Sequence, residues 1–234
     1  MFSFKKFNVN QDQCAMKIGT DAVLLGAWTP IHNNPFSILD IGAGTGILSL
    51  MLAQRSNATQ IYAIEIDEKS YEQCVENFEN SPWNDRLFCF HASLDTFMAE
   101  PQDDYDCIIS NPPFYTEDFK TDNESRDLAR FQDALPFEDL IEASSLLLSE
   151  NGILSVIIPY KEEEKFIALA HQFELFPFKI TRVKGNPNSE LKRSLIALSR
   201  NETTCAFDEL TIETTRHHYT PEYRNLTKDF YLKM

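Results

Sequence analysis

Short apolar runs alternate with longer amphipathic stretches along most of this chain. Runs short enough to be buried strands lie at residues 37–41, 60–65, 87–90, 105–110 and 152–159, with two more near 178–184 and 193–199. Apolar positions recur at helical spacing within residues 46–55, 67–80, 137–148 and about 161–172. Strands that alternate with helices favour crossover connections between parallel strands. We therefore predict an α/β fold in which a mainly parallel sheet carries helices on both faces.

The two ends of the chain show weaker patterns. The first eighteen residues form a polar arm with interleaved phenylalanines. A helix through DAVLLGAW is expected to begin at a capping Thr20 or Asp21. A length of 234 residues favours a single domain, with residues 1–18 as the arm and 19–234 as the core.

Composition narrows the class of protein. The chain is 43% hydrophobic and 24% charged, which is ordinary for a globular protein. No apolar run approaches the ~20 residues of a membrane span, and the N-terminus lacks an apolar signal core, so we expect no membrane contact and a cytoplasmic location. The cysteines are scattered without a CxxC pair, and His217 and His218 lack further ligands. We therefore expect neither a metal site nor a disulfide framework.

A glycine-rich turn follows the first predicted strand, in the run DIGAGTG from Asp40 to Gly46. Gly42, Gly44 and Gly46 alternate between a strand and a helix, where glycine permits a sharp turn and close approach of a ligand to the backbone. The spacing is G-x-G-x-G, whereas dinucleotide folds have G-x-G-x-x-G. The spacing therefore argues against a pyrophosphate ligand and hence against a nicotinamide dehydrogenase.

Two further motifs follow later strands. Glu65 ends the second strand, where a carboxylate can accept hydrogen bonds from both hydroxyls of a ribose. The segment Asn111-Pro112-Pro113-Phe114 follows the strand YDCIIS. Consecutive prolines make this segment stiff, its carbonyl oxygens are acceptors for an amino group, and the Phe114 ring offers a surface for stacking. The motif predicts a pocket for a planar molecule with an amino group.

Together these motifs resemble those of the class I methyltransferases that act on amino nitrogens. The segments MKIGTDAVLLGAW, KRSLIALSR and YTPEYRNLTKDFYL are similar to the bacterial tRNA (adenine-N6)-methyltransferases, which modify the adenosine 3′ of the anticodon. The resemblance implies a Rossmann-like fold and S-adenosylmethionine as methyl donor. It also implies a tRNA substrate methylated on the exocyclic N6, at position 37 of tRNA1(Val).

The resemblance also implies roles for individual residues. The three glycines would cradle the methionine and ribose of the cofactor, Glu65 would hold the ribose hydroxyls, and Asn111 to Phe114 would hold the target adenine. The implied cofactor site further includes Lys17, Thr20, Asp21, Asp40 and Asn111. Relatives often carry an acid after the third strand that contacts the cofactor's adenine. The matching position here is Ser93, with Asp95 two residues later, and either residue is a candidate for that contact.

The net charge of −15 is unfavourable for binding a polyanion, so the cations must be gathered. Between residues 179 and 200 lie Lys179, Arg182, Lys184, Lys192, Arg193 and Arg200, against the single acid Glu190. We expect this segment to flank the cofactor cleft and to hold tRNA phosphates through Lys184, Lys192 and Arg193. The N-terminal arm is expected to add Lys5, Lys6 and Lys17 to the same surface.

Several alternatives stay open. The asparagine–proline motif also suits a methyltransferase of protein glutamine side chains, or of another RNA adenine. A protein that binds the cofactor without catalysis is an alternative of another class. An NAD enzyme is disfavoured by the glycine spacing. The polar stretch 115–133, with Arg126 and Arg130, is either a lid over the substrate or a surface loop.

Overall fold

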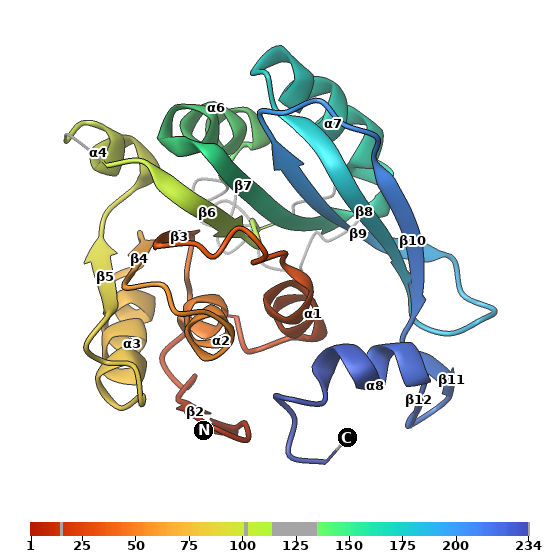
Figure 1. Cartoon of the computed structure of the whole chain (residues 1–234). Coiled ribbons are helices and arrows are strands. Elements are labelled where there is room, and N and C mark those ends of the chain that lie inside the picture. The colour runs from red at the N-terminus through yellow and green to blue at the C-terminus, as the bar shows by residue number, and fades with distance from the viewer. Residues whose placement is uncertain (15, 101–102, 114–134, 234) are drawn as a thin grey trace, which may run out of the picture.

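The computed structural model describes residues 1–14, 16–100, 103–113 and 135–233. Its centre is an eight-stranded sheet with the strand order β10-β8-β9-β7-β6-β3-β4-β5 (Figure 1). The strands are β3 (Ser37–Ile41), β4 (Gln60–Glu65), β5 (Leu87–His91), β6 (Tyr105–Ser110), β7 (Leu148–Pro159), β8 (Phe176–Lys184), β9 (Leu191–Ser199) and β10 (Ala206–Thr211). Within this described sheet, β9 alone runs antiparallel to its neighbours, which confirms the predicted mainly parallel sheet.

Helices cover both faces of the sheet (Figure 1). On one face lie α1 (Thr20–Trp28), α2 (Ile47–Arg55), α3 (Glu68–Glu79) and α8 (Pro221–Thr227). On the other lie α4 (Leu94–Met98), α6 (Phe137–Leu147) and α7 (Glu163–Gln172), which follows the short 3-10 helix η2 (Tyr160–Glu162). Successive strand residues enter opposite cores: Ile38 packs in the core of α1 and α2, and Leu39 in that of α6 and α7. A strand buried on both faces reads as a continuous apolar run, which is why β3 could be predicted.

The N-terminal arm folds against the C-terminal end of the chain. It forms a small hairpin of β1 (Phe2–Ser3) and β2 (Asn8–Val9), and a second hairpin of β11 (Glu213–Thr215) and β12 (His218–Tyr219) precedes α8. Phe4 is buried and pairs with Tyr231 in an isolated bridge, and the Lys5 backbone N–H donates to the Phe230 carbonyl at 2.8 Å. The arm is therefore a packed part of the structure, and both ends of the chain lie together (Figure 1).

None of the described helices is long and apolar enough to cross a bilayer. Among the described residues there is likewise no group of three or more His, Cys, Asp and Glu side chains that could hold a metal ion.

Candidate functional site

The predicted motifs meet at one edge of the sheet. The chain leaves β3, builds β4 and β5 on one side, and returns to place β6 on the other side of β3. Ligands of such sheets bind beyond the carboxyl ends of the strands at this switch point. The Ser110 hydroxyl donates to the Ile41 carbonyl at 2.8 Å. This bond joins the last residues of β6 and β3, so the glycine turn and the Asn111 segment leave the sheet side by side.

The glycine turn has the conformation that its sequence requires. Gly42, Gly44 and Gly46 have φ values of 75°, 56° and 76°, a region that other residues seldom adopt. The backbone N–H groups of Gly42 and Ala43 both donate to the Ile64 carbonyl, at 3.0 and 3.1 Å. The turn is thereby attached to the end of β4, and α2 begins immediately after it.

The three glycines have different surroundings. A Cβ atom added to Gly42 or Gly44 would meet no atom within 4 Å, so these positions border open space. A Cβ atom on Gly46 would lie 2.5 Å from the Phe78 ring and 2.8 Å from the Cys74 sulfur. Gly46 is therefore required by close packing against α3, whereas Gly42 and Gly44 leave room for a ligand to approach the backbone.

Glu65 is more firmly held than its position at a strand end suggests. Its carboxylate is buried and accepts hydrogen bonds from the backbone N–H groups of Gly44 at 2.7 Å and Asp67 at 2.9 Å. A carboxylate has about four lone-pair sites, so acceptor capacity remains for a ligand. Glu65 thus fixes the glycine turn and also offers acceptors beside it.

Asp40 lies beneath the turn and is fully buried. One carboxylate oxygen accepts the backbone N–H of Ser49 at 3.1 Å and its hydroxyl at 2.8 Å, and the other oxygen has no hydrogen-bond partner. Burial, with a smaller contribution from the charge of Glu65, raises the pKa of Asp40 to about 7. The site therefore holds a buried acid that titrates near neutral pH.

The end of β5 adds polar groups next to Glu65. The Ala92 N–H donates to the Glu65 carbonyl at 3.1 Å. Ser93 caps α4: its hydroxyl accepts the Thr96 N–H at 3.1 Å, whereas Asp95 is exposed in the first turn of that helix. Both candidates for the adenine contact therefore follow the strand end, and Ser93 is already partly engaged.

The Asn111 segment follows β6 directly and is only partly exposed. Asn111 and Pro113 are half-buried and Pro112 is buried. Phe114 lies outside the described residues, as do Arg126, Arg130 and the rest of the stretch after the motif.

The segment before α1 reaches the same edge of the sheet. Asp21 pairs with Arg193 at the start of β9, with 2.7 Å between Oδ2 and Nε. The prediction that Thr20 or Asp21 caps α1 was wrong, because the N-cap residue is Gly19 and no side chain caps the helix. The Asp21 carboxylate is instead bonded to the Arg193 guanidinium. Lys17 and Thr20 are exposed.

Buried amides on α3 attach the arm to the glycine turn. The Asn77 side chain accepts the Asn10 N–H at 2.7 Å and donates to the carbonyls of Asn10 and Thr45, both at 2.9 Å. One turn earlier, Gln73 accepts the Gln13 N–H at 3.0 Å. The arm is therefore held along α3 next to the candidate site, a role that the sequence analysis missed. The available signal was a pair of amides four residues apart, Gln73 and Asn77, which each directly precede a buried apolar residue of the helix.

Ile66 is a second residue that the sequence analysis missed. It follows Glu65 directly and is 50% exposed, although Ile is usually buried. Nearby, the rings of Tyr71 and His91 stack with their centroids 5.2 Å apart. The ligand edge therefore offers an apolar side chain next to the buried acid.

The cations of the 179–200 segment have separate roles. Lys184 is paired with Glu209 on β10 at 3.1 Å, Arg182 with Glu163 at 2.6 Å, and Lys179 lies over the Trp28 ring at 4.6 Å. Arg193 pairs with Asp21, and Lys192 is exposed. Lys184 and Leu191 flank the hairpin between β8 and β9, which lies at the same edge as the carboxyl end of β7.

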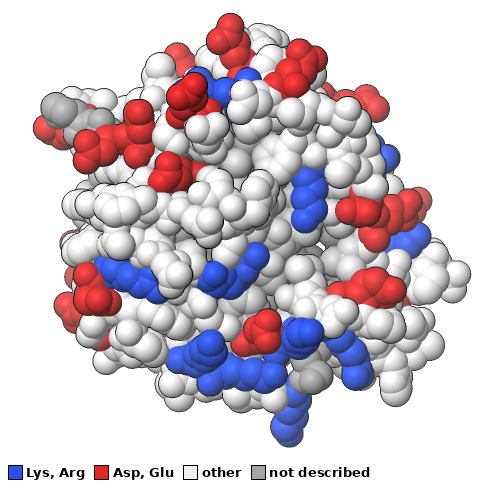
Figure 2. Space-filling view, viewed as in Figure 1, with Lys and Arg blue, Asp and Glu red and all other residues white. Residues whose placement is uncertain are grey.

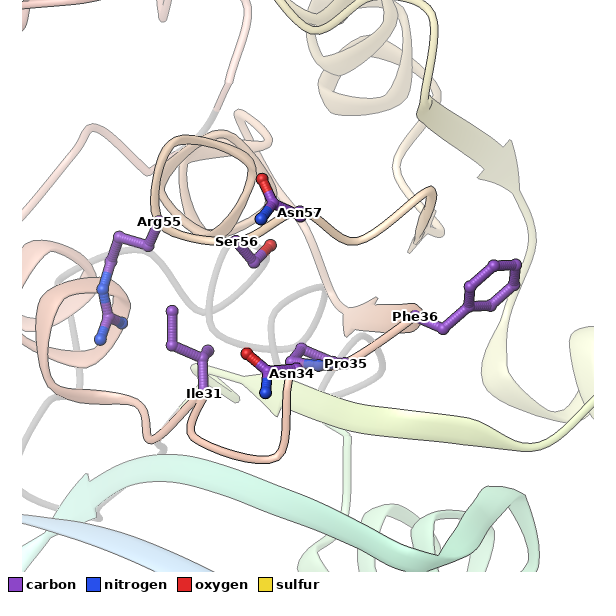
Figure 3. A pocket seen from close by; sticks show the side chains of 7 residues that line it. All are labelled: Ile31, Asn34, Pro35, Phe36, Arg55, Ser56 and Asn57. Carbon is purple, nitrogen blue, oxygen red and sulfur yellow. The ribbon is translucent and has the colours of Figure 1, made fainter.

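A hollow of about 340 Å³ lies at the opposite edge of the sheet, beyond the amino end of β3. It is lined by Ile31, Asn34, Pro35, Phe36, Arg55, Ser56 and Asn57, and Phe36 points away from the other side chains (Figure 3). Its position at the amino ends of the strands makes it an unsuitable place for the ligand of this fold.

Known proteins match the chain over its whole length. The family model of the methyltransferase small domain matches residues 18–178. A protein of Flavobacterium psychrophilum, named tRNA1(Val) (adenine(37)-N6)-methyltransferase, is 70% identical over 234 residues, which is 100% of both chains. Proteins of the same name from Christiangramia forsetii and Trichodesmium erythraeum are 59% and 43% identical, and the matches cover at least 98% of each chain.

Solved structures share the fold. A predicted O-methyltransferase from Agrobacterium tumefaciens has a TM-score of 0.70 at 22% identity, covering 90% of this chain and 96% of that one. A ribosomal protein L11 methylase from Lactobacillus delbrueckii has a TM-score of 0.55 at 19% identity, covering 77% of each chain. At these identities the likeness concerns the fold alone.

Proposed function

Because the chain belongs to the methyltransferase small-domain family, we infer that it transfers a methyl group from S-adenosylmethionine to the N6 amino group of adenosine 37 in tRNA1(Val). Full-length relatives that carry this name, at identities up to 70% among those given above, support the substrate. We further propose that the chain works as one methyltransferase domain, with the N-terminal arm as part of it.

The residues at the sheet edge fit this cofactor. Open space above Gly42 and Gly44 allows close approach to the backbone, and Glu65 keeps acceptor capacity for two ribose hydroxyls. Ile66 would pack against a flat purine, and Ser93 or Asp95 would accept a hydrogen bond from its amino group. The segment Lys17 to Asp21 would line the methionine end, above the buried carboxylate of Asp40. The bound cofactor supplies a methyl group that its sulfonium already activates.

The acceptor is the difficult partner in this reaction, because the lone pair of an adenine amino group is delocalised into the ring. Acceptors at the Asn111 side chain and the Pro112 carbonyl would bind the two amino hydrogens and localise the lone pair on nitrogen. These bonds strengthen as positive charge develops on the nitrogen, so they stabilise the transition state more than the ground state. The base must leave its stack to reach them, which costs least in a single-stranded loop.

The observation that carries this proposal is the Ser110–Ile41 hydrogen bond at 2.8 Å, because it sets the acceptor motif beside the glycine turn. Proximity of the two reactants accounts for a large part of the catalysis in such a site. Lys192 and Arg193 at the same edge would contact the phosphates around the target base.

The test uses tRNA that lacks the modification, a labelled methyl donor and mass spectrometry of the nucleosides. We expect N6-methyladenosine at position 37, and Asn111→Ala should lower turnover on the order of a hundredfold with little change in cofactor binding. If the labelled methyl group is found on a protein glutamine or on another RNA adenine, that group is the substrate in place of adenosine 37. Cofactor binding without any turnover would identify a non-catalytic scaffold.

A further inference from the structure

Four cations gather where the chain ends meet. They are Lys5, Lys6, Arg55 and Lys228, which we term the distal basic surface. Figure 2 shows Lys and Arg side chains along the lower part of the face in view, where Figure 1 places both termini and α8, and Asp and Glu side chains mainly above and at the sides. Segments separated by most of the sequence thus form one positive region on a protein whose net charge is −15.

Specific contacts bring these cations together. The Lys5 ammonium donates to the Lys228 carbonyl at 2.5 Å. Lys6 and Arg55 line one hollow of about 440 Å³, whose walls also include Gln54, Asn225 and Asp229. The Arg55 guanidinium donates to the Gly26 carbonyl at 2.7 Å, and burial lowers its pKa. The arrangement is fixed by the backbone of the arm, α2 and the C-terminal segment.

The positive charges of the distal basic surface are not neutralised by ion pairs with carboxylates of the described residues. None of the four cations forms an ion pair with a carboxylate of the described residues, unlike Arg182, Lys184 and Arg193. Asp229 is the acid that lines the hollow with them. Unpaired cations that are held close together repel one another, and a polyanion would relieve this repulsion.

The surface is remote from the candidate active site. α2 begins at the glycine turn and ends at Arg55, so the helix separates the two places by its nine residues, or roughly 13 Å at 1.5 Å per residue. The prediction that Lys5 and Lys6 flank the cofactor cleft was therefore wrong. The arm carries them to the other end of α1 and α2, and only its later part, from Asn10, is attached to the glycine turn through Asn77.

We propose that the distal basic surface binds the phosphate backbone of the tRNA outside its anticodon arm. This inference rests on the proposed function, since it concerns the same substrate. When the target base occupies the candidate site, the isolated anticodon stem-loop has few phosphates beyond that site. The rest of a full-length tRNA supplies many more phosphates that could reach the distal basic surface. Contacts to phosphates position a nucleic acid without reading its sequence, which suits a surface of lysines and one arginine.

The experiment compares full-length tRNA with its isolated anticodon stem-loop as substrates. Lys6→Glu and Lys228→Glu should each weaken binding of full-length tRNA several-fold, and the double variant should weaken it at least tenfold. The slope of log affinity against log salt should fall by roughly 0.7–0.9 for each phosphate that the variant no longer neutralises. Methylation of the stem-loop should be unchanged in all three variants, because the cleft is untouched.

Lys165→Glu is the matched control, since Lys165 is exposed on α7 at the other face and its replacement changes the net charge equally. If the Lys6 and Lys228 variants bind full-length tRNA as the control does, the proposal is wrong. It is also wrong if they weaken the stem-loop and the full tRNA alike. Failure of the proposed function has a different signature, because the unaltered protein would then methylate neither RNA.

Discussion

Asp40 should make the stability of the protein depend on pH, because its carboxylate is buried and one of its oxygens has no hydrogen-bond partner. Burial raises the pKa of Asp40 from 3.8 to about 7. The folded state therefore holds this proton more tightly than the unfolded state does. Stability from this group is full below about pH 4, falls as the pH rises, and is lost once the pH has passed about 7.

Replacing Asp40 by Asn should remove this dependence. The free energy of unfolding of Asp40→Asn, relative to the unaltered protein, should increase between about pH 4 and 7, by on the order of a few kcal/mol. Denaturant unfolding at a series of pH values measures the difference. If the difference in free energy of unfolding between the two proteins is constant over this pH range, Asp40 does not titrate there.

Glu65 should be important for both folding and binding. Glu65→Ala leaves the N–H groups of Gly44 and Asp67 without their acceptor, which should cost about 1–3 kcal/mol of stability, and it removes hydrogen bonds to the cofactor ribose worth about 1.5–3 kcal/mol. Thermal unfolding without cofactor and calorimetric titration with it separate the two effects. Glu65→Gln keeps the size of the side chain and one acceptor, so its stability and cofactor affinity should lie between those of the unaltered protein and Glu65→Ala. Cofactor affinity that survives in the Ala variant would remove Glu65 from the site.

At the scale of elements, α3 supports the site through a side chain that need not touch the cofactor. Asn77→Ala removes three hydrogen bonds that join the arm to the glycine turn. We expect several-fold weaker cofactor binding and faster amide exchange at Asn10. Asn80→Ala is the matched control, because Asn80 is the C-cap of the same helix and its side chain donates to the Glu76 carbonyl of that helix rather than to the arm. Equal cofactor affinity in the two variants would show that the arm is not part of the cofactor site.

The sequence allowed good prediction of those elements whose pattern is local. β4 and β6 were predicted with their observed bounds, since a short apolar run suffices to predict a buried strand. β10, by contrast, is mostly exposed and pairs only with β8, so its residues lack an apolar pattern. The start of α1 was mispredicted because the partner of Asp21 is 172 residues away.

At the scale of the whole molecule, ion pairs between residues far apart in the sequence decide which cations remain available to bind RNA. Lys184 and Arg193 are each paired with an acid, whereas Lys192 is exposed near the start of β9. Lys192→Glu should therefore weaken tRNA binding and lower its salt dependence while cofactor affinity is unchanged. Arg193→Glu should weaken cofactor binding as well, because it places a second negative charge beside Asp21. Filter binding at several salt concentrations measures the tRNA affinity and its salt dependence, and titration with cofactor measures the cofactor affinity. If neither variant affects tRNA, the RNA is held elsewhere.

The bridge between Phe4 and Tyr231 has a consequence for how the protein matures during synthesis. Residue 4 leaves the ribosome early, but its partner is made more than two hundred residues later, so the arm waits for almost the whole of translation. Contacts of such long range form late, because closing the intervening loop costs entropy. The arm also forms one side of the candidate site, through Asn77. In a nascent chain Asn10 can therefore be bound by Asn77 of α3 before α8 is made, whereas the earlier part of the arm, around Phe4, can pack only after Tyr231 has been added.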